Sequence, residues 1–348
     1  MGRSYSLFLQ DVAELSTRVT ATAGVLLNRD EYIARRDASE GLAAIDTTLL
    51  TFGFGKTVQP RVGVSVVLDS SVRDKVYANY GRYYNLDNKS LSRAASPFRI
   101  FSSDAQFDLT GRLLRDVPRA SETGKVILPG LDPTHTDELV AGYARPLGRH
   151  WSVELWGMYR ETNDFIEDFP TTNLQGTNLN PPSPGSYVYG NLNGTAPSTG
   201  KAYRKYRALT LQARRTGERF SLDASYTLSR LSGNWDLDYA TSLFYSSSAL
   251  QDGPGLYVED PNRDGTLIGD RTHVLKVFAH AEVARRTIVG AYLRVQSGAP
   301  WQALGLDYVA SYRRYLEPAG SHRLDTWTNL DLLASHTQIG RASCRERV

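Results

Sequence analysis

In the segment from Trp151 to Arg160, every second residue belongs to an apolar set that has aromatic residues at its ends. The residues between them include charged ones. The apolar set is Trp151, Val153, Leu155, Gly157 and Tyr159, and the other set is Ser152, Glu154, Trp156, Met158 and Arg160. A period of two places the two sets on opposite faces of a β-strand. The pattern predicts a strand with lipid against one face and water against the other.

The same unit recurs along the chain as five hairpins with tight turns. The expected strand pairs are 5–12 with 19–28, 61–69 with 75–84, the two strands within 138–164, 206–214 with 220–229, and 273–283 with 287–296. An eleventh strand is expected to start near Thr326. The sequence therefore predicts an all-β fold, a partial antiparallel transmembrane β-barrel with ten whole strands and part of an eleventh.

The connections between hairpins are much longer than the turns within them. They cover residues 31–60, 85–137, 165–205, 231–272 and 297–325. Loops longer than about 15 residues are uncommon in compact soluble domains, whereas outer-membrane barrels combine short periplasmic turns with long extracellular loops. We expect these connections outside the cell. The Asn-, Gly-, Pro- and Ser-rich stretch 173–200 is not expected to continue a ladder, and loop aromatics such as Trp235 and Trp301 either stack on a ligand or pack the loops.

Composition restricts the alternatives. Apolar residues make up 41% of the chain, its mean hydropathy is −0.37, and no run approaches the roughly 20 apolar residues of a membrane helix. A soluble β-sandwich shares the alternation, but sandwich loops are usually short at both ends, so this reading is the weaker one. The formal charge of +3 is too small to indicate a nucleic-acid partner.

The last ten residues, IGRASCRERV, do not continue the strand pattern. They resemble a sequencing-adapter sequence translated in frame, so we predict that residues 1–338 are a barrel fragment and that residues 339–348 are a non-native tail. The only cysteine, Cys344, falls in that tail. We expect the remainder to be an internal piece of a longer precursor, without its plug domain and its C-terminal strands.

The sequence carries no motif of a catalytic site. Its six histidines are scattered, no HExxH motif or close carboxylate pairing indicates zinc, and neither a phosphate-binding loop nor a Gly-x-Ser-x-Gly elbow is present. A triad of dispersed residues is the weak alternative. We therefore predict that the protein is not an enzyme.

One short segment has the spacing of calcium ligands. Asp260, Asn262 and Asp264 alternate and are followed by Gly265, as in the first half of a D-x-[DN]-x-[DN]-G loop. Position twelve, where an EF-hand has a bidentate Glu, is Arg271, so an EF-hand is excluded. A looser extracellular calcium site at these three residues is predicted beside the simpler reading of an Asx-turn, and no other cofactor is expected.

Several segments in order carry a family resemblance. They are SYSLFLQDVAELSTRVTATAGVLLNRDEY, DPTHTDELVAGYARPLGRHWSVELWGMYRETNDFIED, KYRALTLQARRTGERFSLDASYTLSR, GDRTHVLKVFAHAEV and RVQSGAPW. Together they resemble the barrel of TonB-dependent outer-membrane receptors, with the Oar-like branch most similar. The resemblance implies a Gram-negative outer-membrane location within the full-length protein, lipid around the barrel, an energy supply from the TonB complex through the absent plug region, and an extracellular ligand of unknown identity.

The function that the resemblance implies is binding of an extracellular ligand and its energised import. A passive porin-like or adhesin barrel is the alternative, and an upstream plug with a TonB box distinguishes the two. Charged residues on the hydrophilic strand faces are expected inside the barrel, because an Arg or Lys at the lipid midplane is unfavourable by about 2 to 4 kcal/mol. They are Glu154, Arg160, Arg214, Asp223, Lys276, Glu282 and Arg294. We expect them to be solvated and to pair across the lumen, and none is assigned to the ligand.

Overall fold

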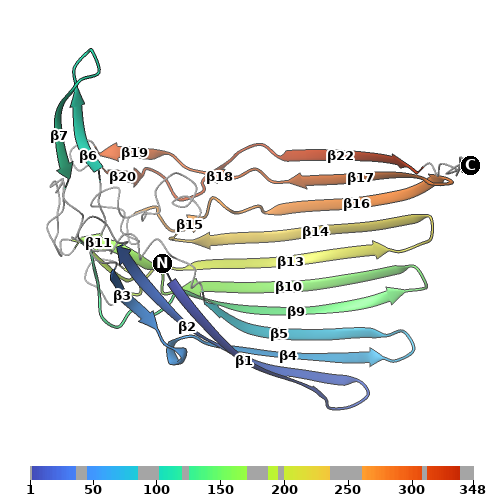
Figure 1. Ribbon diagram of the computed structural model, residues 1–348. Coiled ribbons are helices and arrows are strands. Elements are labelled where there is room, and N and C mark those ends of the chain that lie inside the picture. Colours follow the sequence, from blue (N-terminus) through green and yellow to red (C-terminus); the bar gives the residue numbers. More distant parts are fainter. Residues whose placement is uncertain are drawn as a thin grey trace, which may run out of the picture.

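A computed structural model describes residues 2–36, 45–84, 102–119, 125–170, 187–194, 200–235, 261–307 and 312–337 (Figure 1). Eleven long strands form one continuous antiparallel sheet in chain order. They are β1 (Gly2–Glu14), β2 (Val19–Arg36), β4 (Val58–Asp69), β5 (Asp74–Tyr84), β9 (His135–Leu147), β10 (Trp151–Asn163), β13 (Arg204–Arg215), β14 (Phe220–Gly233), β16 (His273–Ala284), β17 (Thr287–Gln296) and β22 (Trp327–His336). The five predicted hairpins, the eleventh strand and the all-β class are confirmed.

The two ends of this sheet differ, as Figure 1 shows. At one end, the turn end, strands join through short turns such as Gly148 to His150 and Arg285 to Arg286. Gly148 has φ +68° and Arg286 has φ +66°, which is the left-handed conformation that tight turns use and that glycine adopts most readily. At the other end, the loop end, lie the long connections. The predicted asymmetry of the connections is confirmed.

The long connections contain short strands of their own. β3 (Ile45–Phe52) pairs with β2, β6 (Ser102–Phe107) pairs with β7 (Leu113–Arg119), and a three-stranded sheet has the order β11-β12-β8. The remaining elements are β8 (Lys125–Ile127), β11 (Ile166–Pro170), β12 (Tyr187–Asn191), β15 (Gly265–Thr266), β18 (Pro300–Trp301), β19 (Leu304–Asp307), β20 (Tyr312–Tyr315), β21 (His322–Arg323) and the 3-10 turn η1 (Phe54–Lys56).

The expectation that stretch 173–200 continues no ladder is wrong at β12. This strand pairs antiparallel with β11 and parallel with β8. Its sequence, YVYGN, begins with aromatic and β-branched residues that favour strands. Its parallel partner lies in another connection of the chain, so a reading of local sequence cannot identify that pairing.

Burial in this fold is inverted relative to that of a soluble sheet. The side chains of Leu139, Leu155, Leu209 and Leu228 are between 43% and 50% exposed on one face of the sheet. A buried cluster instead forms among the connections, where Tyr32, Phe52, Leu131 and Tyr189 are each at most 7% exposed. A large exposed apolar face marks an interaction surface. None of the described residues belongs to a helix long and apolar enough to cross a lipid bilayer.

Candidate functional site

The strand register aligns polar side chains in rows across the sheet. Arg160 of β10 lies opposite Glu138 of β9 and opposite Tyr206 of β13. Directly opposed residues project from the same side of a sheet. We call this side the polar face, and the side that carries Leu139 and Leu209 the apolar face.

The polar face has a groove near the loop end, which we call the polar groove. The Arg160 guanidinium donates a hydrogen bond to the Glu138 carboxylate and forms an ion pair with it. Beside this pair the hydroxyl oxygens of Thr136 and Thr162 are 2.8 Å apart. The groove has a volume of about 800 Å³, and its lining also includes Tyr83, Met158, Arg204, Tyr206 and Leu231. Its aromatic, cationic and anionic groups suit a polar ligand better than an apolar one.

Further polar contacts continue toward the turn end. The Tyr77 hydroxyl donates to Glu154 over 2.6 Å, and Arg214 forms an ion pair of 2.9 Å with Asp223. The register continues these rows to Lys276 and Arg294, which lie opposite each other. The seven charged residues that the sequence assigned to hydrophilic strand faces therefore share the polar face. Arg160 and Arg214 pair with carboxylates on adjacent strands, whereas pairing across the lumen stays a prediction.

A buried carboxylate organises the loop end near β14 and β16. Asp270 is 1% exposed, and its carboxylate accepts hydrogen bonds from the Leu231 backbone N–H at 2.6 Å and the Thr272 hydroxyl at 3.0 Å. The Arg323 guanidinium completes this set with an ion pair. Asp270 therefore joins the end of β14, the approach to β16 and strand β21.

A second set of contacts joins other connections. The Lys56 ammonium donates to the Asp132 carboxylate at 2.8 Å and to the Leu131 carbonyl at 2.7 Å. The Asn191 side-chain amide then donates to the Asp132 carbonyl at 2.8 Å and to the Asp164 carbonyl at 2.9 Å. The connections that hold η1, β8 and β12 are thereby joined side by side.

The predicted calcium ligands are partly described. Asp260 lies outside the described residues. The Asn262 side-chain amide donates to the Tyr315 carbonyl at 3.3 Å, and Asp264 accepts a bond of 2.6 Å from the Tyr203 hydroxyl. Burial, together with this bond to Asp264, raises the pKa of Tyr203 to about 12. The described residues include no group of three or more His, Cys, Asp or Glu side chains placed to hold a metal, and calcium binding stays a prediction.

The two loop tryptophans pack differently. Trp235 is 1% exposed and its ring lies 6.1 Å from that of Phe165, with the Arg263 guanidinium 5.1 Å from the Trp235 ring centre. Trp301 is 45% exposed and stacks on His322 at 4.5 Å. Trp235 therefore packs the loops together, whereas Trp301 keeps a surface open to solvent.

The sequence reading missed Asp270 and Arg323. Asp270 belongs to no recognisable sequence motif, and Leu231 and Arg323, which it binds, lie 39 and 53 residues away in the sequence. The only local signal is that Asp270 and Thr272 are a short Asx-like pair, a pattern that turns share.

Comparison with known proteins identifies the family. The family description "TonB dependent receptor-like, beta-barrel" matches residues 2–342. The TonB-dependent transporter Oar of Myxococcus xanthus is 27% identical over 372 residues, which covers 92% of this chain and 32% of that protein. This agrees with the resemblance to the Oar-like branch.

Solved structures of similar fold include two receptors. The siderophore receptor PiuA of Acinetobacter baumannii has a TM-score of 0.54 and 11% identity, covering 96% of this chain and 37% of that one. The ferripyoverdine receptor of the outer membrane of Pseudomonas aeruginosa has a TM-score of 0.52 and 12% identity, with coverages of 96% and 32%. At these identities the likeness shows the fold alone.

The chain spans about a third of the length of these relatives. Its exposed apolar face and its polar face are those of a strand wall between lipid and a lumen. The turn end is accordingly periplasmic and the loop end extracellular. This chain, a portion of an outer-membrane barrel and not an enzyme, belongs to the TonB-dependent receptor-like β-barrel family.

Proposed function

We propose that this chain forms part of the wall of a receptor that captures an extracellular ligand and imports it across the outer membrane with energy delivered through TonB. The polar groove carries the proposal, because Arg160 and Glu138 line a cavity on the polar face near the extracellular connections. A ligand that leaves the connections for the lumen meets this groove early. The rows around Glu154 and Asp223 then continue a hydrated path toward the periplasmic end.

The transport proposed here requires binding and passage, without a covalent step. Paired charges along the wall bind water and can solvate a polar ligand. An Arg or a carboxylate on this face also avoids the energetic penalty of facing lipid. The siderophore receptors of similar fold supply one ligand class to test first, a ferric chelate. The connections would select the ligand, since specificity belongs to sites and not to folds.

The test compares strains that carry or lack the intact gene, each with and without functional TonB. Solutes removed from a defined iron-limited medium are measured by mass spectrometry, with a mixture of ferric siderophores added. We expect gene-dependent depletion of a solute only where TonB functions. Depletion that continues without TonB would support a passive porin-like barrel, and surface attachment without any depletion would support an adhesin.

Substitutions then connect transport to the groove. Arg160→Gln combined with Glu138→Gln removes both charges while keeping similar side-chain volumes, and should reduce uptake by about tenfold if the pair contacts the passing ligand. Arg219→Gln, in an exposed turn at the periplasmic end, is the matched control and should leave uptake unchanged. Equal uptake by the groove variant and the control would remove the groove from the ligand path.

A further inference from the structure

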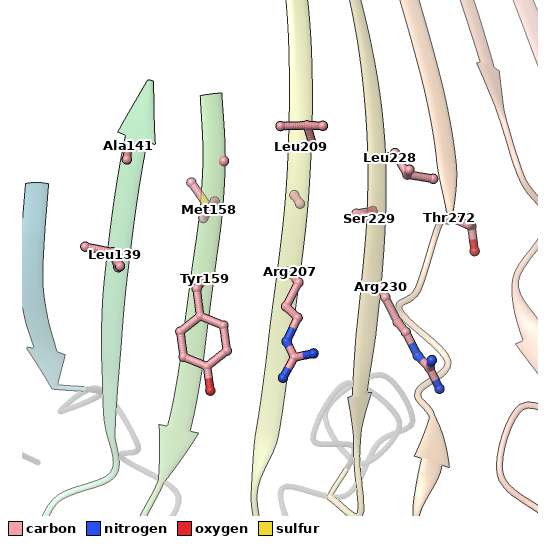
Figure 2. A pocket seen from close by; sticks show the side chains of 12 residues that line it. Leu139, Ala141, Met158, Tyr159, Arg207, Leu209, Leu228, Ser229, Arg230 and Thr272 are labelled. Carbon is pink, nitrogen blue, oxygen red and sulfur yellow. The ribbon is translucent and has the colours of Figure 1, made fainter. Parts of the chain in front are cut away.

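Two arginines lie directly opposite each other on the apolar face. Arg207 of β13 pairs with Arg230 of β14 in the register, and Arg207 also lies opposite Tyr159 of β10. Figure 2 shows that the side chains of Tyr159, Arg207 and Arg230 all extend in one direction from three adjacent strands, beyond Leu209 and Leu228. These three residues form what we call the basic row.

The charge of the basic row is not neutralised within the described part of the chain. No carboxylate there lies within ion-pair distance of Arg207 or Arg230, and Arg207 contacts the Tyr159 ring instead, 5.7 Å from its centre. In the next row toward the loop end, Lys205 pairs with Glu161 at 3.7 Å, and the Glu161 carboxylate also accepts a hydrogen bond of 2.6 Å from the Tyr159 hydroxyl. Like charges directly opposed on one face of a sheet are destabilising, so the arginine pair would be stabilised by an external anion.

The basic row lies at the border of the lipid-facing band. From Phe220 to Arg230 a strand rises by roughly 33 Å, and a tilt of about 40° reduces this to roughly 25 Å, the height of the apolar band of such barrels. Phe220 is at the periplasmic end of β14 and Arg230 is near the extracellular end. The two guanidinium groups therefore lie at the depth of the outer-leaflet headgroups.

An apolar groove adjoins the basic row on its membrane side. It has a volume of about 620 Å³ and is lined by Leu139, Ala141, Leu209 and Leu228 together with the row itself. Leucine side chains on this face are about half exposed and offer a surface for acyl chains. The arrangement joins an apolar strip to a pair of planar guanidinium groups, each of which can bind phosphate with two parallel hydrogen bonds.

We propose that the basic row binds the phosphate of an acylated, phosphate-bearing lipid of the outer leaflet, whose chains lie along the adjoining leucines. Arg207 and Arg230 bridge one phosphate group, and the Tyr159 ring lies beside the headgroup at the interface, where tyrosine is favoured. This inference rests on the family assignment, which places the apolar face against lipid, and is independent of import. An intact membrane lipid is thus a bound component of the wall.

The test uses the full-length receptor in zwitterionic detergent and native mass spectrometry. The probe is diphosphorylated lipid A, compared with lipid A stripped of phosphate, with diacylglycerol and with inorganic phosphate. We expect the wild-type protein to retain the diphosphorylated lipid over all three comparators. Retention should fall by about tenfold or more in the variant Arg207→Gln with Arg230→Gln.

Two further variants keep the result interpretable. Arg207→Lys with Arg230→Lys preserves the charge without the planar fork, and should bind between the wild type and the Gln variant. Arg215→Gln, at the periplasmic border beside Phe220, is the matched control and should retain lipid A like the wild type. Equal retention of phosphate-free lipid A, or undiminished binding by a folded Gln variant, would overturn the proposal. Inorganic phosphate that binds as well as the lipid would show a simple anion site and overturn the lipid assignment.

Discussion

Arg323 pairs with the buried carboxylate of Asp270 across 53 residues of sequence. Asp270 also binds the Leu231 backbone, so this single side chain holds the end of β14 and strand β21 against the approach to β16. Extracellular connections that carry ligand contacts must keep a defined shape. The ion pair between Arg323 and Asp270 helps to fix the shape of these connections. The exposed apolar face of the sheet provides no buried core that could do so.

Removing the arginine should loosen these connections. Arg323→Met leaves the Asp270 carboxylate without its cation, and because the Arg323 side chain is about one third exposed, we expect a loss of about 1 to 3 kcal/mol of local stability, below the value for a fully buried pair. Limited proteolysis of the purified full-length receptor measures this local opening.

Arg271→Met is the control for that experiment. Arg271 donates to the carbonyls of Ile268 and Asp270 and forms no ion pair in the described structure, so its loss should change the stability by less than about 1 kcal/mol. Identical cleavage rates for the two variants would mean that the Asp270 pair does not hold the connections together.

The exposed Trp301 stack should respond to acid. Its partner His322 contacts Glu317 at 2.9 Å, and the backbone N–H of Ala303, followed by the His322 hydrogen bond, holds the pKa of Glu317 below its usual range. A carboxyl whose pKa is lowered by folding stabilises above its unfolded pKa, near 4.3, and this contribution is lost as the pH falls through the folded pKa.

Tryptophan fluorescence measures the state of this stack. We expect the emission of Trp301, taken as wild type minus Trp301→Phe, to change below about pH 4.3 as Glu317 is protonated. In Glu317→Gln the change below pH 4.3 should disappear. A transition of Trp301 that is unaltered in Glu317→Gln would assign the acid response to another group.

The strands of the sheet were predictable because the membrane imposes a physical period on them. Residues such as Leu209 must face lipid and residues such as Gln212 must face water, so a period of two appears directly in the sequence. The hairpin turns followed from the same pattern. The observed register then places Arg160 opposite Glu138, a pair that the pattern alone did not identify.

The connections were not predictable in the same way. Their packing uses pairs that are distant in sequence, such as Lys56 with Asp132 and β12 with β8. No local period marks such pairs, and a single Asp or Asn has the same local appearance in a turn as in a buried network. The contacts among the connections could therefore be identified only from the three-dimensional structure.

The predicted calcium site consists of Asp260, Asn262 and Asp264. The Asp264 carboxylate accepts a hydrogen bond from the Tyr203 hydroxyl, and a bound cation would compete for that oxygen because hard cations favour carboxylate ligands. Calorimetric titration of the full-length receptor with CaCl₂ should give a saturable heat that Asp264→Asn reduces by at least about tenfold in affinity. Tyr203→Phe, which removes the competing hydroxyl, should not weaken binding. The absence of binding heat in the wild type would refute the prediction of a calcium site.

Gly142 is required by close packing on the polar face. A Cβ at this position would lie 2.6 Å from the Tyr77 ring and 2.8 Å from the Trp156 Cβ. Gly142→Ala must therefore displace Tyr77, whose hydroxyl donates to Glu154, and we expect a loss of about 1 to 3 kcal/mol.

Gly157, on the next strand, provides the matched control for Gly142. A Cβ there would meet only the Ala208 carbonyl oxygen at 3.8 Å, an ordinary contact, and alanine also reduces the freedom of the unfolded chain. Denaturant unfolding of the full-length receptor should show Gly142→Ala unfolding at lower denaturant concentration and Gly157→Ala unfolding at or slightly above the wild-type midpoint. Equal unfolding midpoints for Gly142→Ala and Gly157→Ala would show that the close packing of Tyr77 over Gly142 does not contribute to the stability of the sheet.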